Sequence, residues 1–149
     1  MGRENFIYKS YCELIITSEV LDPDEITGEL GIRPTRSFRK GDKIISKYST
    51  RTGEKKNNLW ALKTKENVSE KESINLHIKE LQSVLENKDD AIISYKEDID
   101  VEVCIWIWIE TDNAGIGLDL NEEEQTFLSK ISNRIHLSVI CKKEIEDEI

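Results

Sequence analysis

The chain reads Leu21-Asp-Pro-Asp-Glu-Ile-Thr-Gly-Glu-Leu-Gly-Ile-Arg-Pro34 near its N-terminus, and this stretch holds a complete set of signals for one short helix. Asp22 is placed as the N-cap, and Pro23 follows as the first helical residue, where its missing N–H does no harm. Glu25 stands at the third position and resembles the acidic member of a capping box. Gly31 supplies the left-handed residue that often ends a helix. We therefore predict a helix between these limits.

Alternating apolar and polar residues flank this helix and predict strands. Such patterns cover 8–18, 58–64, 100–110 and 134–141. Shorter candidate strands lie at 91–95 and 115–120. We also predict a hairpin in which 43–50 pairs with 57–64.

Two further helices are expected in the second half of the chain. Ser69 and Glu72 form a capping-box pattern before apolar residues at helical spacing, and Asn87 begins the polar run that ends this helix. Asn121 is placed to cap a third helix, whose acidic first turn suits the helix dipole.

The stretch 100–110 is the clearest strand and has two apolar faces, which is typical of a central strand. Its β-branched residues alternate with Cys104, Trp106 and Trp108. We expect the β-branched face to meet the helices and these tryptophans to be partly exposed. Together with Trp60 they are candidates for a stacking or protein-docking platform. The alternative is that the tryptophans pack beneath the helices.

The order of predicted elements favours an α+β fold with a mostly antiparallel sheet and about three helices largely on one face. No repeat and no linker divides the chain, so we expect residues 1–149 to form one domain, with frayed ends at 1–7 and 142–149.

Composition predicts a cytoplasmic protein that does not contact membranes. The longest apolar run, 103–109, is far shorter than the roughly 20 residues that span a bilayer, and residues 1–5 do not begin a secretory signal. Cys12, Cys104 and Cys141 are isolated and odd in number, which favours free thiols in a reducing compartment.

Charge is distributed unevenly along the chain. Nine cations and two anions lie between Ile32 and Asn58, so this segment carries +7 and the remainder −16 of the total −9. One interpretation is an anion site in the basic 33–56 segment, and the other is a solvated loop balanced by the acidic remainder. Nucleic acid is a weak candidate, because few aromatics interleave the cations and the acidic remainder would repel phosphates. The candidate binding residues of this segment are Arg33, Arg36, Arg39, Lys40 and Asp42.

No catalytic or metal-binding constellation is visible in the sequence. The two histidines, His77 and His136, have no nearby nucleophile along the chain, and no pair of closely spaced cysteines or histidines suits zinc. We therefore expect no enzyme activity, no metal and no cofactor.

The segments 21–27, 30–34, 40–42 and 59–62 together resemble the bacterial family named domain of unknown function 4279. The resemblance extends from about Tyr11 to Val139. It implies a compact bacterial cytoplasmic α+β domain without an assigned activity, of a kind often encoded beside toxins. We therefore expect a stoichiometric protein-binding module, such as a toxin-neutralising immunity protein with a basic partner. The oligomeric state stays open.

Overall fold

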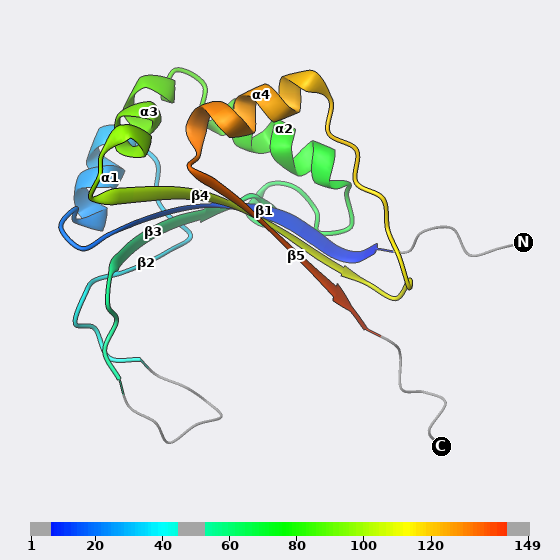
Figure 1. Cartoon of the computed structure of the whole chain (residues 1–149), viewed down its shortest axis with the longest axis horizontal. Helices are drawn as coiled ribbons and strands as arrows, with labels where there is room; N and C mark the ends of the chain where they lie inside the picture. Colours follow the sequence, from blue (N-terminus) through cyan, green and yellow to red (C-terminus); the bar gives the residue numbers. More distant parts are fainter. Residues whose placement is uncertain (1–6, 45–52, 143–149) are drawn as a thin grey trace, which may run out of the picture.

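The computed structural model describes residues 7–44 and 53–142, and within them five strands form one sheet in the order β2-β3-β1-β4-β5 (Figure 1). The strands are β1 (Ile7–Ser18), β2 (Arg36–Phe38), β3 (Asn58–Lys63), β4 (Val101–Thr111) and β5 (Arg134–Cys141). The helices in these residues are α1 (Pro23–Leu30), α2 (Ile74–Val84), α3 (Asp89–Glu97) and α4 (Glu122–Ile131), with a single 3₁₀ turn η1 (Thr64–Glu66).

The sheet is mostly antiparallel, as predicted. The long strand β1 pairs antiparallel with both β3 and β4, and β2 adds antiparallel to β3 at one edge. At the other edge β5 runs parallel to β4, because α4 carries the chain back to the starting end of the sheet.

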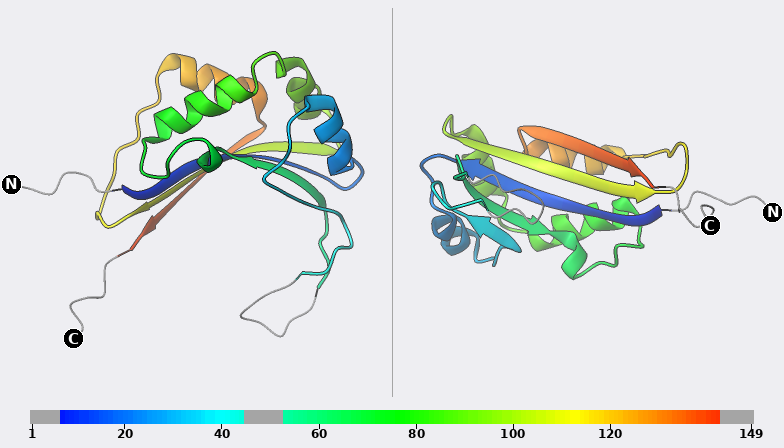
Figure 2. Two further views of the ribbon diagram at one scale, coloured as in Figure 1. Left: turned by 180° about the vertical axis from the view of Figure 1, so that it is seen from behind. Right: turned by 90° about the horizontal axis from the view of Figure 1, so that it is seen from below.

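The helices cover one face of the sheet, which also confirms the prediction. Seen from below, the strands lie in front of the helices, and no described helix crosses their near side (Figure 2). The main core lies between the layers, where Leu14 and Ile16 of β1 and Ile105 and Ile107 of β4 are almost fully buried beneath the helices. The fold class is therefore α+β, with four helices in the described residues instead of about three.

Helix α1 begins and ends where the sequence predicts. The Oδ1 atom of Asp22 accepts a hydrogen bond from the backbone N–H of Asp24 at 2.8 Å, and Gly31 ends the helix with φ of 67°. The cap is therefore Asp22 bonded to the second helical position rather than the predicted capping box with Glu25.

The predicted N-cap of the second helix is wrong by four residues. Helix α2 begins at Ile74 with Ser73 as its N-cap, and Ser69 opens a turn instead. The hydroxyl of Ser10 on β1 donates to the carbonyl of Glu72 at 2.6 Å, which holds this turn against the sheet. A tertiary contact thus replaces the local capping pattern.

The short strands predicted at 91–95 and 115–120 are also wrong. Residues 91–95 lie inside α3, which buries Ile92 and Tyr95 on one side. A left-handed residue, Asn87 with φ of 66°, separates this helix from α2. Residues 115–120 pair with no described strand; every second side chain packs against the core.

The strand that pairs with β3 is not the one that the predicted hairpin supplies. Strand β3 pairs with Arg36–Phe38 rather than with 43–50, and Lys43 forms an isolated bridge with Glu54. The rest of that prediction, 45–50, lies outside the described residues. So do the predicted frayed ends, except that Ile7 begins β1 and Lys142 forms an ion pair with Glu110.

Candidate functional site

The face of the sheet opposite the helices, called the open face below, carries an aromatic row from three strands. The register sets Tyr11 of β1 opposite Trp108 of β4, and Trp106 of β4 opposite His136 of β5. Side chains alternate along a strand, so residues directly opposite each other share one face. Tyr11, Trp106, Trp108 and His136, all partly exposed, therefore form the aromatic row.

The members of the row stack in two pairs. The rings of Tyr11 and Trp108 lie 6.1 Å apart at 16°, and those of Trp106 and His136 lie 3.9 Å apart at 30°. The ammonium group of Lys63 lies 5.3 Å from the centre of the Tyr11 ring. Burial, assisted by the charge of Glu13, raises the pKa of Tyr11, so its hydroxyl stays protonated. The two pairs bring four partly exposed aromatic side chains together on neighbouring strands, and aromatic side chains of this kind are common at protein interfaces.

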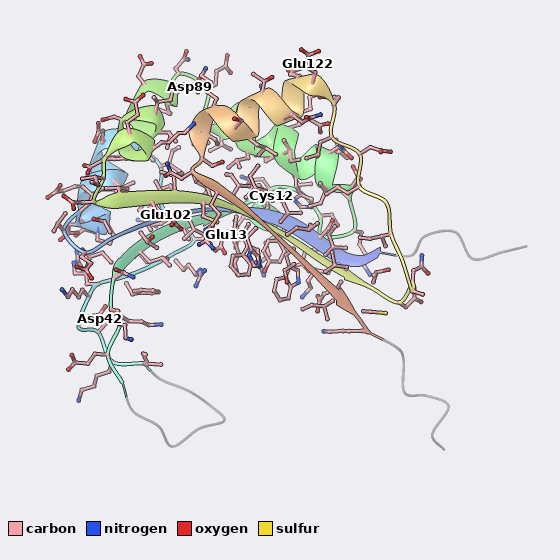
Figure 3. The ribbon with its side chains drawn as sticks, viewed as in Figure 1. Cys12, Glu13, Asp42, Asp89, Glu102 and Glu122 are labelled. Atoms are coloured by element: carbon pink, nitrogen blue, oxygen red, sulfur yellow. The ribbon has the colours of Figure 1, made fainter. Side chains whose placement is uncertain are left out.

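Beside the row lies a buried carboxylate. Glu13 is 4% exposed and accepts two bonds from Arg36, Nε to Oε2 at 2.9 Å and Nη2 to Oε1 at 3.2 Å. This two-point geometry fixes the planes of both groups. Figure 3 shows Glu13 beneath the sheet, on the side away from the helices.

Several other charges of the open face are also paired within the described residues, whereas Lys63 lies over the Tyr11 ring. Arg134 bonds Glu102 at 2.8 Å. Glu110 lies 2.5 Å from the Nζ atom of Lys142, whose hydrogen bond lowers the pKa of that carboxyl, and 3.7 Å from Lys9. These pairs neutralise much of the charge on the open face.

A small apolar cluster continues the open face towards β2. Its buried members are Ile15, Leu59, Ala61 and Cys104, with Phe38 and Trp106 packed against them. This cluster anchors one side of Trp106, so that the row rests on a packed base.

The predicted tryptophans do not share one surface. Trp106 and Trp108 lie on the open face as expected, and the β-branched residues between them face the helices. Trp60 lies on the opposite side and is fully buried, and its Nε1–H donates to the hydroxyl of Thr27 in α1 at 3.0 Å. Trp60 is therefore part of the core.

The predicted basic residues are not brought together. Arg36 bonds Glu13 on the open face, whereas Arg39 reaches the start of α1 and bonds Asp22 at 3.1 Å and Asp24 at 2.6 Å. Arg33 lines a separate cleft of about 370 Å³ beside α2.

Lys40 and Asp42 have structural contacts in the turn after β2. The backbone N–H of Lys40 donates to Asn58 Oδ1 at 2.7 Å, and Asp42 Oδ2 accepts from the backbone N–H of Arg39 at 2.8 Å. Gly41 allows this turn, because its φ is 92°.

The helical layer carries most of the acidic groups of the described elements. Its four helices contain ten carboxylates and three cations. Some of these carboxylates line an open cleft of about 1090 Å³ between α2, α3 and α4. Two of them, Asp89 and Glu122, lie on the side of the helices that faces away from the sheet (Figure 3). The two sides of the molecule therefore differ in charge as well as in side-chain type.

Two thiols and one histidine of the described chain are buried. Burial raises the pKa of the Cys12 thiol to about 12 and also that of Cys104. His77 is fully buried between the hydroxyl of Thr64, 2.6 Å from Nδ1, and the carbonyl of Ser69, 3.0 Å from Nε2. These bonds fit a neutral structural ring, and burial lowers its pKa.

Two kinds of feature are absent from the described residues. No group of three or more histidine, cysteine or acidic side chains is arranged to hold a metal ion, and no helix has the length and apolar character to traverse a bilayer.

Sequence reasoning missed three residues that define the open face, Tyr11, Glu13 and His136. Alternation along β1 placed Tyr11 and Glu13 on the face opposite Leu14. Their meeting with β4 depends on the register between strands, which a single strand pattern does not contain.

Comparison with known proteins gives one match. The family model described as Domain of unknown function (DUF4279) matches residues 8–142. The match covers most of the chain, so the protein belongs to this family and the predicted resemblance is confirmed. Searches of curated proteins and of solved structures found no match.

Proposed function

We propose that this DUF4279 protein is a stoichiometric protein-binding module of the bacterial cytoplasm, such as a toxin-neutralising immunity protein, and that the open face is its contact surface. One observation carries the proposal. Within the described residues the sheet is covered on one side only. Its other side presents a row of partly exposed aromatic side chains, which is unusual for surface that stays in water.

The ion pairs favour a protein over a polyanion. Arg36 and Arg134 are bonded to carboxylates of the same face, so neither is free to neutralise a phosphate. Arg39 is likewise bonded at the start of α1. A nucleic acid would need a continuous basic path, whereas a protein partner can use flat aromatic area framed by satisfied charges.

The helical layer favours a basic partner. With a net charge of −9, the chain attracts positively charged proteins over distances of about a Debye length and speeds their approach. Attraction of this kind weakens as salt is added. Free cysteines in the described residues fit a reducing compartment.

A capture experiment followed by reconstitution tests the proposal. Tagged protein is incubated with host lysate at physiological salt, and the captured partner is purified and titrated by calorimetry. We expect one partner per chain and at least a tenfold loss of affinity in the Tyr11→Ala/Trp108→Ala variant. Leu76→Ala, which truncates an exposed apolar side chain on α2, is the matched control and should bind normally.

Two outcomes contradict the proposal. Equal affinity of wild type and Tyr11→Ala/Trp108→Ala would exclude the open face as the contact surface. Nucleic acid in the eluate without protein, seen as absorbance at 260 nm, would instead favour the basic 33–56 segment as an anion site.

A further inference from the structure

The edge strand β5 carries an uncovered apolar stripe on the helix side of the sheet. Ile135, Leu137 and Val139 are 46%, 50% and 44% exposed, although they lie opposite fully or almost fully buried isoleucines of β4. The helices thus cover β4 but leave this part of β5 open. Three neighbouring exposed aliphatic side chains on one strand form an apolar patch.

The backbone of the same residues points out of the sheet. In a parallel pair, alternate residues of a strand direct both N–H and C=O towards the same neighbour. The N–H of Lys142 donates to the carbonyl of Thr111 on β4 at 2.7 Å, so the even-numbered residues of β5 face β4. Ile135, Leu137 and Val139 accordingly direct their N–H and C=O groups to the outer edge, where no described strand lies.

The two edges of the sheet differ in how they resist pairing. At one edge β2 is only three residues long and runs into Arg39 and Lys40, which discourages strand addition. At the other edge β5 is eight residues long, and from Ile135 to Cys141 it contains no charge, proline or glycine. The β5 edge therefore lacks the features that keep an edge strand unpaired.

We propose that β5 pairs antiparallel with β5 of a second copy of this chain, forming one continuous sheet of ten strands. A two-fold axis at Leu137 sets it opposite Leu137 of the second copy, and Ile135 opposite Val139 of the second copy. All outward N–H and C=O groups then bond each other, and both apolar stripes continue across the axis. This contact lies on a different surface from the proposed function and does not depend on it.

A second copy fits this edge better than an unrelated strand, because the stripe is self-complementary about Leu137. The net charge of −9 on each chain opposes association, but the paired segment itself is uncharged, and Arg134 falls opposite the uncharged Ile140 of the second copy. One strand pair buries less than the roughly 800 Å² per partner of tight complexes, so the dimer is reversible.

Sedimentation velocity over a range of protein concentrations tests the proposal. We expect wild type to shift from monomer to dimer as concentration rises, and Leu137→Lys to stay monomeric with an unchanged circular dichroism spectrum. Leu76→Lys is the matched control, since Leu76 is a 44% exposed leucine on another surface, and it should dimerise like wild type. A wild-type monomer at every concentration, or a dimer that survives Leu137→Lys, would overturn the proposal.

A cross-linking experiment tests the register and does not depend on the lysine variant. In a Cys141→Ser background, Leu137→Cys places two thiols opposite each other at the two-fold axis, where antiparallel neighbours lie about 5.5 Å apart between Cα atoms. Mild oxidation should give a covalent dimer. Val20→Cys in the same background is the control, because Val20 is 71% exposed and lies away from β5, and it should stay monomeric. Equal cross-linking by both variants would refute the β5 register.

Discussion

The two faces of β4 show how one strand can serve two environments. Val103, Ile105 and Ile107 point to the helices and are almost fully buried, whereas Trp106 and Trp108 point to the open face and are partly exposed. The first face is built for packing and the second for contact. A substitution at an odd-numbered residue of this strand should therefore change stability, and one at an even-numbered residue should change binding.

Charge separates the same two sides. The four described helices contain ten carboxylates and three cations, and the five described strands contain three carboxylates and four cations. Long-range attraction of a basic partner thus originates mainly on the helix side, while the open face offers short-range contacts.

The largest contrast is expected between two tryptophans. Trp60→Ala removes a fully buried ring and its bond to Thr27 and should lower the free energy of unfolding by about 3–5 kcal/mol. Trp108→Ala removes a partly exposed ring stacked on Tyr11 and should cost about 1 kcal/mol. Urea denaturation monitored by circular dichroism measures both. Comparable losses would mean that the open face is part of the core.

The buried carboxylate of the open face should give the next largest effect. Arg36→Met leaves Glu13 buried without its partner and should cost about 2 kcal/mol, because Arg36 is half exposed and water screens part of the loss. Glu13→Gln leaves a neutral group that still accepts a bond from Arg36 and should cost less. Urea denaturation at neutral pH compares the two. The reverse order would show that the charge of Glu13 stabilises the fold through groups other than Arg36.

On the helix side, His77 should make stability depend on pH. Burial holds the pKa of His77 below its ordinary value of 6.5, so the unfolded chain binds more protons in that range. The free energy of unfolding should fall as pH drops below 6.5. His77→Gln, which can still bond Thr64 and Ser69, should flatten this dependence. Urea denaturation from pH 7.5 to pH 5 measures the slopes, and an unchanged slope in His77→Gln would contradict the assignment.

Local patterns predicted most of the fold. The signals at Asp22, Pro23 and Gly31 act within one helical turn, so α1 appears where they place it. The alternation over 100–110 also identified β4 as a strand with neighbours on both sides, although β1 rather than β4 lies at the centre of the sheet, and it identified the face that meets the helices. The start of α2 was misplaced because the turn after Ser69 is held by Ser10, a contact between distant parts of the chain.

The candidate site was less predictable, because it depends on which strands become neighbours. The separation of Trp60 from Trp106 follows from the pairing of Trp60 with Ile16, which puts it on the helix side. The arginines of the basic segment likewise found carboxylates on β1 and α1 that adjacent sequence does not reveal. The sequence shows which side chains of one strand share a face, but it does not show which residues of neighbouring strands lie opposite each other.

The smallest change concerns solvent access rather than stability. Acrylamide quenching should detect a fast-quenched fraction in wild type, from Trp106 and Trp108, and this fraction should disappear in Trp106→Phe/Trp108→Phe, which leaves only the buried Trp60. The variant should unfold at nearly the wild-type urea concentration, since phenylalanine keeps the aromatic packing. If the remaining Trp60 were quenched as strongly as the wild-type average, the helix side would be open to solvent. Such a result at Trp60 would contradict the assignment of the helix side as the packed face and the open face as the contact surface.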